Sequence, residues 1–372
     1  MGAHGTDAAL MRSILQRIAT GPELSKNISR EEARAGMRLI LDGQVDPVQA
    51  GIFLIALRMK RETDDEMCGM MDALRDATHT TVAPVDELID IGDPYDGYTR
   101  SLPVAPFLPA LLAACGVPTV SHGVESMGPK YGVTHRQVLR AAGLSLNASM
   151  AQAAARLADP AVGWSYIDQS VFCPKLHGLA ALRSLIVKRP ALTTIEVLLG
   201  PVRARRKTHL VTGYVHKAYP RVYALLARAA GFDSALLVRG IEGGVIPSLR
   251  QEGKYFFYCN GGEEQERRVT PADFGWSQPL SPAPVPDPLR PRENAPEENA
   301  ALDIAGLAQA AAEAGRRALQ GEPGVVRDNL IAAAALCLHH VGKHASLRAA
   351  AEAAGAALDA GRALARFYRP GG

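Results

Sequence analysis

The sequence has little cysteine, no long apolar run and almost no net charge. Its five cysteines are scattered and none belongs to a Cys-x-x-Cys pair, which argues against a disulfide framework and a structural zinc site. No run of about 18 uncharged apolar residues occurs. The N-terminus also lacks a basic segment followed by an apolar one. We therefore expect a cytoplasmic protein with reduced cysteines and no membrane partner.

The length and the charge limit the classes of protein that fit. The chain has 372 residues, of which 47% are hydrophobic, so it can bury one large core or two moderate ones. Two domains are the expectation. The formal net charge of +3 gives no overall basic character of the kind that nucleic-acid binding produces, although local basic clusters still can bind.

Residues 1–82 are predicted to form a small all-helical domain. Two capping boxes, Ser29 with Glu32 and Thr63 with Glu66, each mark the start of a helix. Asp46 followed by Pro47 marks a third start, because proline in the first turn loses no hydrogen bond. A fourth apolar stripe precedes these. Four amphipathic helices with short connections are typical of a helical lobe.

After residue 83 short strands alternate with helices, which predicts an α/β domain over 83–372 with a mainly parallel sheet flanked by helices. Strands are expected at 88–91, 118–120, 210–215, 235–239 and 254–259. Helices are expected at 107–115, 134–142, 149–158, 177–189, 219–231, 301–319, 324–342 and 346–367. Seven prolines within 277–298 predict an extended surface loop there.

The first candidate site is the polar loop that follows the strand at 88–91. Parallel sheets bind ligands beyond the carboxyl ends of their strands. Backbone N–H groups of this loop could face a phosphate, and an arginine at its end could pair with the anion. An ordinary polar turn is the alternative. The candidate residues are Gly92, Asp93, Asp96, Gly97, Thr99 and Arg100.

Other polar residues lie where further strands and helices end. His122 and Gly123 end a strand, and the next loop holds Ser126 and Lys130; these could contact the same ligand or merely cap the strand. His177 precedes a helix and could face a ligand or be structural. The densest basic cluster is Arg203, Arg205, Arg206 and Lys207. It could contact the phosphates of a nucleotide or of nucleic acid, or be an exposed basic loop.

Several short motifs, in a shared order, resemble the anthranilate phosphoribosyltransferase family (class IV phosphoribosyltransferases, glycosyltransferase family 3). The closest likeness is to its divergent anthranilate-phosphoribosyltransferase-like branch. The motifs are 49–58 (QAGIFLIALR), Glu62-Thr63, His122-Gly123, Lys130 with Gly132, Pro174 with His177, 198–201 (LLGP), 270–275 (TPADFG) and 327–329 (RDN).

The resemblance implies a helical lobe joined to an α/β domain. It also implies a homodimer that forms through the helical lobe. It implies displacement of pyrophosphate from phosphoribosyl pyrophosphate by an aromatic amine, with Mg²⁺ on the phosphates. Such a reaction mainly requires charge neutralisation and positioning. By resemblance, the substrate-binding set comprises the first loop together with His122, Gly123, Ser126, Lys130, His177 and Arg183.

The sequence also departs from the family pattern. Where the family has Gly-Thr-Gly-Gly-Asp-Gly, residues 92–97 read Gly-Asp-Pro-Tyr-Asp-Gly, so two glycines that admit a pyrophosphate are lost. Ser121 replaces the lysine that precedes His-Gly. The family's magnesium-binding Asp-Glu pair falls near 243–246, which leaves Glu242 as the only nearby acid. The anthranilate-binding arginine falls near Val187, with Arg183 one turn earlier as a substitute.

Two functions therefore stay open. One is a transferase that binds a phosphorylated ribose donor and an acceptor other than anthranilate. The other is a catalytically inactive relative that binds nucleic acid or another polyanion through residues 203–207. Loss of the magnesium pair weighs against the first, and the near-neutral charge weighs against the second. The transferase is preferred.

Overall fold

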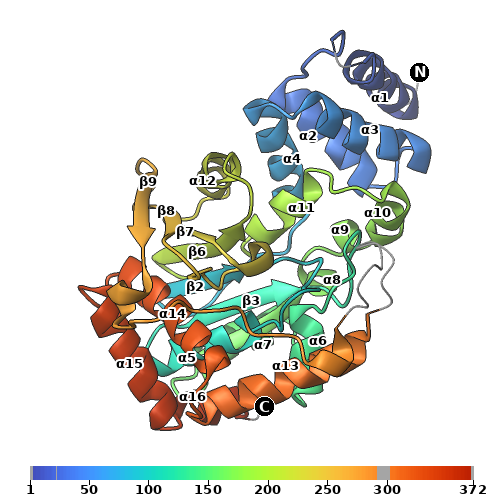
Figure 1. Ribbon diagram of the computed structural model, residues 1–372. Coiled ribbons are helices and arrows are strands. Elements are labelled where there is room, and N and C mark those ends of the chain that lie inside the picture. Colours follow the sequence, from blue (N-terminus) through green and yellow to red (C-terminus); the bar gives the residue numbers. More distant parts are fainter. Residues whose placement is uncertain (1–2, 22, 291–301, 370–372) are drawn as a thin grey trace.

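The structure is a computed structural model that describes residues 3–21, 23–290 and 302–369, and its N-terminal part is helical as predicted (Figure 1). The helices are α1 (Ala3–Ile18), α2 (Arg30–Leu41), α3 (Pro47–Lys60) and α4 (Asp64–Asp76). Both predicted capping boxes form: the Ser29 and Thr63 hydroxyls accept hydrogen bonds from the N–H groups of Glu32 and Glu66. The boundary between residues 82 and 83 stays a prediction.

The second part contains a mainly parallel sheet, which confirms the predicted fold class. Its order is β4-β3-β2-β6-β7-β8-β9, where the first five strands are parallel and β8 and β9 are antiparallel. The strands are β2 (Glu87–Gly92), β3 (Thr119–Gly123), β4 (Trp164–Asp168), β6 (Lys207–Tyr214), β7 (Ser234–Arg239), β8 (Gly253–Tyr258) and β9 (Gln265–Val269). A separate pair joins β1 (Thr81–Val82) to β5 (Val202–Arg203). All five predicted strands are present, and β1, β4, β5 and β9 were not predicted.

Helices cover both faces of this sheet, while α10 lies beside the helical lobe, where it contacts α3 (Figure 1). The helices of this part are α5 (Leu108–Ala114), α6 (His135–Ala141), α7 (Met150–Ala158), α8 (Gln169–Phe172), α9 (Pro174–His177), α10 (Ala180–Ile186), α11 (Leu192–Ile195), α12 (Tyr219–Ala229), α13 (Ile304–Leu319), α14 (Val325–His340), α15 (Leu347–Asp359) and α16 (Arg362–Phe367). Two predicted helices are wrong as single elements. The segment 177–189 contains α10 and stops at the left-handed Val187, and 346–367 is interrupted at the left-handed Gly361.

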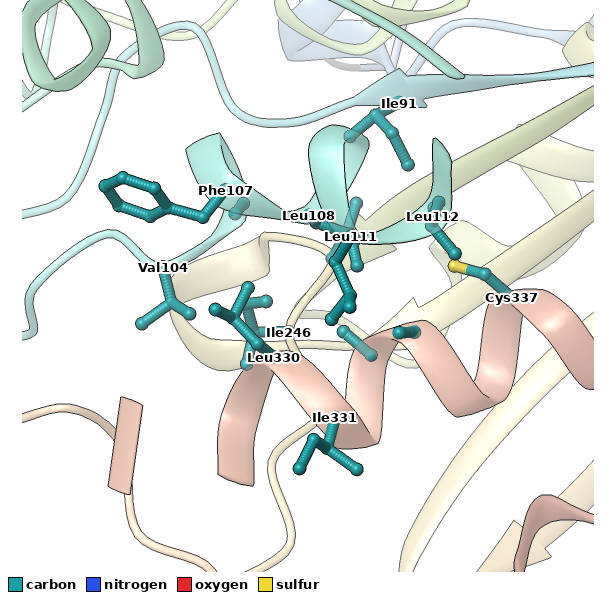
Figure 2. Packing of buried hydrophobic residues seen from close by; sticks show 14 of the residues in the cluster. Ile91, Val104, Phe107, Leu108, Leu111, Leu112, Ile246, Leu330, Ile331 and Cys337 are labelled. Atoms are coloured by element: carbon teal, nitrogen blue, oxygen red, sulfur yellow. The ribbon is translucent and has the colours of Figure 1, made fainter. Parts of the chain in front are cut away.

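One core lies between the sheet and helices α5 and α13–α16. Figure 2 shows α5 and α14 facing each other, with Leu108 and Leu111 near Leu330. A second core joins the other face of the sheet to the helical lobe. The proline-rich segment is extended over 277–290, but Leu280, Ala283 and Val285 are buried there, so it is not a surface loop throughout. Residues 291–298 of that prediction lie outside the described residues. No helix in the described ranges is long and apolar enough to cross a membrane.

Candidate functional site

The predicted loop after β2 and the turn after β7 meet at the carboxyl end of the sheet. This happens because β2, β6 and β7 are parallel neighbours whose ends share one edge. The turn, Ile241–Gly243, brings Glu242 onto the loop. The Glu242 carboxylate accepts hydrogen bonds from the backbone N–H groups of Thr99 (3.0 Å) and Arg100 (2.9 Å) and from the Ser101 hydroxyl (2.8 Å). The Lys130 ammonium lies 2.8 Å from the same carboxylate.

We call this set of donors the anion cradle: the N–H groups of Thr99 and Arg100, the hydroxyls of Thr99 and Ser101, and the Lys130 ammonium. Burial alone would raise the pKa of Glu242, but Lys130 and the hydrogen bonds from Thr99 and Ser101 hold it below its usual value. Glu242 is therefore ionised near neutral pH. The backbone amides of Thr99 and Arg100 face an anion, which is the chain's own Glu242 carboxylate; whether the loop binds a phosphate stays a prediction.

The residues around Glu242 do not fit Mg²⁺. Amide N–H groups and an ammonium attract an anion and repel a cation, while Mg²⁺ requires several oxygen ligands. The neighbouring Ile246 is buried in the apolar cluster with Val104 and Leu330 (Figure 2). Across the described ranges, no group of three or more His, Cys, Asp or Glu side chains could hold a metal ion. The carboxylate at Glu242 thus completes an ion pair and not a metal site.

Asp93 is buried beside the turn that carries Glu242. Its carboxylate accepts hydrogen bonds from the Tyr98 hydroxyl (2.9 Å) and the Val245 N–H (3.1 Å), and burial raises its pKa to about 6. His135 Nδ1 is 4.0 Å from Asp93, and burial lowers the pKa of His135 to about 3. Neither ring nitrogen of His135 has a hydrogen-bond partner in the described part of the chain. A Cβ at Gly244 would lie 1.7 Å from the Tyr98 hydroxyl, so this packing requires glycine there.

Tyr95 is buried in the bend of the loop that follows β2. Its hydroxyl is 2.5 Å from His122 Nδ1, and His122 Nε2 is 2.8 Å from Asp90 Oδ1. The three residues are 2%, 1% and 0% exposed. The sequence left open whether His122 contacts a ligand or caps its strand, and the structure places it in this buried chain of hydrogen bonds. The neighbouring Gly123 packs beside Tyr166.

Two further charged residues of the predicted site are also paired internally. The Arg183 guanidinium binds both oxygens of Glu196 at 2.6 and 2.8 Å, and these side chains are 1% and 0% exposed. Asp96 is bound by Arg189 at 2.7 Å. Arg183 was expected to hold the carboxylate of a substrate, and here it holds the carboxylate of Glu196.

The remaining predicted residues are placed as follows. The Gly92 carbonyl accepts a hydrogen bond from Thr212 Oγ1, and the Gly97 carbonyl accepts one from Lys130. Ser126 is exposed and His177 is half-buried. No hydrogen bond or ion pair in the described residues connects Ser126 or His177 with the cradle. The structure therefore brings together Thr99, Arg100, Lys130 and Glu242, but not the full predicted set.

The basic cluster lies at the opposite, amino end of the sheet. Lys207 opens β6 and pairs in register with Glu87. Arg203 is committed to the fold, since it donates to the carbonyls of Gly200 and Ala230 and stacks on Phe232. The side chains of Arg205, Arg206 and Lys207 are exposed and make no hydrogen bond or ion pair in the described residues.

A polar cavity of about 670 Å³ adjoins this cluster, between the helical lobe and the α/β part. Four arginines and three aspartates line it: Arg30, Arg34, Arg75, Arg203, Asp72, Asp76 and Asp233. Arg30 and Arg34 of α2 pair with Asp72 and Asp76 of α4 at 2.6 Å. The sequence did not predict this cavity because its walls come from segments far apart in the chain. The spacing of Arg30, Arg34 and Arg38 by one helical turn is the one local signal.

Comparison with known proteins connects this geometry to a family. The family model of the glycosyl transferase family helical bundle domain matches residues 12–78. An anthranilate phosphoribosyltransferase from Rhodopseudomonas palustris is 26% identical over 96% of each chain. An uncharacterised protein from Aquifex aeolicus is 28% identical over 60% of this chain and 65% of its own length.

Solved structures show the same fold. The yeast anthranilate phosphoribosyltransferase in complex with PRPP and Mg superposes with a TM-score of 0.73, at 15% identity over 96% of each chain. The likeness of fold, the matched helical bundle and the full-length relative agree. The chain is therefore related to the anthranilate phosphoribosyltransferases of glycosyltransferase family 3.

Proposed function

We propose that this chain keeps the phosphoribosyltransferase scaffold without transferring a ribosyl group to anthranilate, and that it binds nucleic acid as a polyanion. The observation that supports this is the internal filling of the inherited site. Glu242 accepts the hydrogen bonds that the phosphates of a ribose substrate would need. Glu196 pairs with the Arg183 guanidinium. Tyr95 and Tyr98 fill the space that smaller residues would leave open.

The binding surface proposed is the basic tract at residues 205–207, which adjoins the polar cavity. Exposed lysines and arginines without carboxylate partners are the groups that neutralise phosphates and release counterions. Arg205, Arg206 and Lys207 have this character, and they lie beside the cavity residue Ala204. A nucleic-acid backbone that crosses this tract would also pass the arginines of α2 and α4.

The test is the salt dependence of binding to a fluorescein-labelled oligonucleotide, followed by anisotropy. The wild type should bind with an affinity that falls linearly on a logarithmic salt scale. With a duplex oligonucleotide, R205A/R206A/K207A should reduce that slope by about 2.7, because each of three phosphate contacts contributes about 0.9. K254A/R268A/R316A is the matched control, since it removes three exposed cations that are already paired with glutamates. No slope, or an equal loss in the control, would refute the proposal.

A second candidate is phosphoribosyl transfer to an acceptor other than anthranilate. The survival of the amides and Lys130 as an anion cradle favours it, as does the full-length similarity to an anthranilate phosphoribosyltransferase. Calorimetry with phosphoribosyl pyrophosphate and Mg²⁺ should then give heat, while anthranilate is not consumed. If no heat appears under conditions where the protein stays folded, this candidate is excluded.

We also propose that a second copy of this chain covers the outer face of α3. The helix is apolar nearly all round, which is typical of a helix buried on both sides. Val48, Ile52 and Met59 are exposed on it, and Leu185 of the contacting α10 is 80% exposed. I52E/M59E should convert a dimer into a monomer in sedimentation equilibrium. V215E, at an exposed valine outside this face, is the control and should leave the dimer intact.

A further inference from the structure

The backbone that carries Glu242 is in a conformation that disfavours it. Glu242 has φ 51° and ψ 22°, in the left-handed region that residues with a Cβ rarely adopt. Such a residue persists only when its surroundings fix it in place, and such residues cluster at sites that bind or switch. Here the surroundings that fix it are the five donors of the anion cradle.

Glycines allow the turn to dock tightly. A Cβ at Gly240 would lie 1.5 Å from the Gly244 carbonyl oxygen, and a Cβ at Gly213 of β6 would lie 2.1 Å from the same atom. Gly243 has φ 86°. The turn is thus pressed against β6 by residues that admit several backbone conformations. The packing of this turn against β6 positions the Glu242 carboxylate, and it holds Glu242 in the left-handed conformation.

All five donors of the anion cradle contact the Glu242 carboxylate. One oxygen of Glu242 faces the Thr99 N–H (3.0 Å), the Thr99 hydroxyl (3.3 Å) and the Lys130 ammonium (2.8 Å). The other faces the Arg100 N–H (2.9 Å) and the Ser101 hydroxyl (2.8 Å). Two amides, two hydroxyls and one ammonium from two separate segments therefore converge on a single anion.

We propose that Glu242 is an intramolecular latch: a tethered carboxylate that closes the cradle and must leave before an anion from solution can enter. A tethered group competes at a high effective concentration. The affinity of an external anion is then reduced by the fraction of molecules in which the latch is open. This goes beyond the proposed binding of nucleic acid, which uses the amino end of the sheet and does not depend on the latch.

Inorganic pyrophosphate is the probe, with binding measured by calorimetry. E242G removes the carboxylate and the left-handed strain together, and it should bind pyrophosphate at least about 10-fold more tightly than the wild type. E242Q keeps the size of the side chain but not its charge, so it should give an intermediate gain. Adding K130M to E242G should abolish the gain, because the ammonium supplies a full positive charge to the cradle.

The alternative is that Glu242 has a structural role only, in which it joins the loop at 99–101 to the turn Ile241–Gly243. That view is correct, and the latch is wrong, if folded E242G gains no affinity or if the gain survives K130M. Folding is checked by a cooperative thermal transition of each variant.

The wild type gives an independent test: the amide resonances of Thr99 and Arg100 should shift as pyrophosphate is added. Unchanged resonances up to the solubility limit would also refute the latch. Oligonucleotide binding should be equal in E242G and wild type.

Discussion

Three basic side chains at the carboxyl end of the sheet have carboxylate partners, and three at the amino end have none among the described residues. At the carboxyl end, Lys130, Arg183 and Arg189 each meet a carboxylate from another segment of the chain. At the amino end, Arg205, Arg206 and Lys207 extend into solvent without a carboxylate partner among the described residues. The ion pairs at the carboxyl end hold loops and helices together. The positive charges at the amino end are exposed and can bind a partner. The charged groups at the carboxyl end therefore connect segments of the chain to one another.

The difference has a consequence for stability. Removing one partner of a buried ion pair leaves an uncompensated charge in a low-dielectric interior, whereas removing an exposed charge leaves a hydrated surface. The same kind of substitution should therefore have a large effect at the carboxyl end and a small one at the amino end. The three predictions below test this contrast in order of the expected effect.

The largest effect is expected for Arg183→Leu. Its partner Glu196 is 0% exposed and would keep only the hydrogen bond from Gln169 (3.2 Å). The free energy of unfolding should fall by about 3–5 kcal/mol, measured by urea denaturation. The double variant R183L/E196Q removes both charges and keeps an acceptor for Gln169, so it should recover most of that loss. Equal losses in the single and double variants would show that packing, and not the pair, matters here.

An intermediate, pH-dependent effect is expected for Asp93→Asn. The pKa of Asp93 is about 6 in the folded protein and 3.8 without the surrounding fold, so the folded state holds the proton more tightly. Its contribution to stability is fully present below about pH 4 and is lost as the pH rises through 6. A difference of two pKa units corresponds to about 3 kcal/mol. D93N should therefore gain stability relative to the wild type by up to that amount between pH 4 and 7.

The comparison of D93N with wild type at each pH is necessary because His135 acts in the opposite sense. Its pKa is lowered to about 3, so its contribution is present above about pH 6.5 and is lost as the pH falls. The difference between the two proteins removes the part of this contribution that does not depend on the charge of Asp93. A constant difference from pH 4 to 7, measured by denaturation, would mean that Asp93 stays ionised over the whole range.

Local features of the fold could be predicted from the sequence, and contacts between distant segments could not. The capping boxes at Ser29 and Thr63 were found because a cap and its partner lie three residues apart. Strand β9 was missed because its edge position leaves polar side chains exposed, so it lacks an apolar alternation. The break at Gly361 was missed because the apolar spacing of α15 and α16 continues across it.

The same distinction applies to the candidate site. The loop 92–100 was located correctly at a strand end, since this follows from the alternation of strands and helices. The anion in its cradle comes from a residue 142 positions away from Arg100, and no local pattern indicates that pairing. Arg183 was named as a substrate ligand because a sequence shows its charge but not the burial of Glu196 opposite it.

The smallest effect on stability is expected for R205A/R206A/K207A. These side chains make no bond in the described structure, and the hydrogen bonds of this segment come from backbone N–H groups to the carbonyls of Val85 and Asp86. Truncation leaves those bonds in place, so the free energy of unfolding should change by less than about 0.5 kcal/mol. The same variant should lose oligonucleotide affinity. A stability loss as large as that of Arg183→Leu would mean that the amino end also uses its charges for folding, and the contrast between the two ends would not hold.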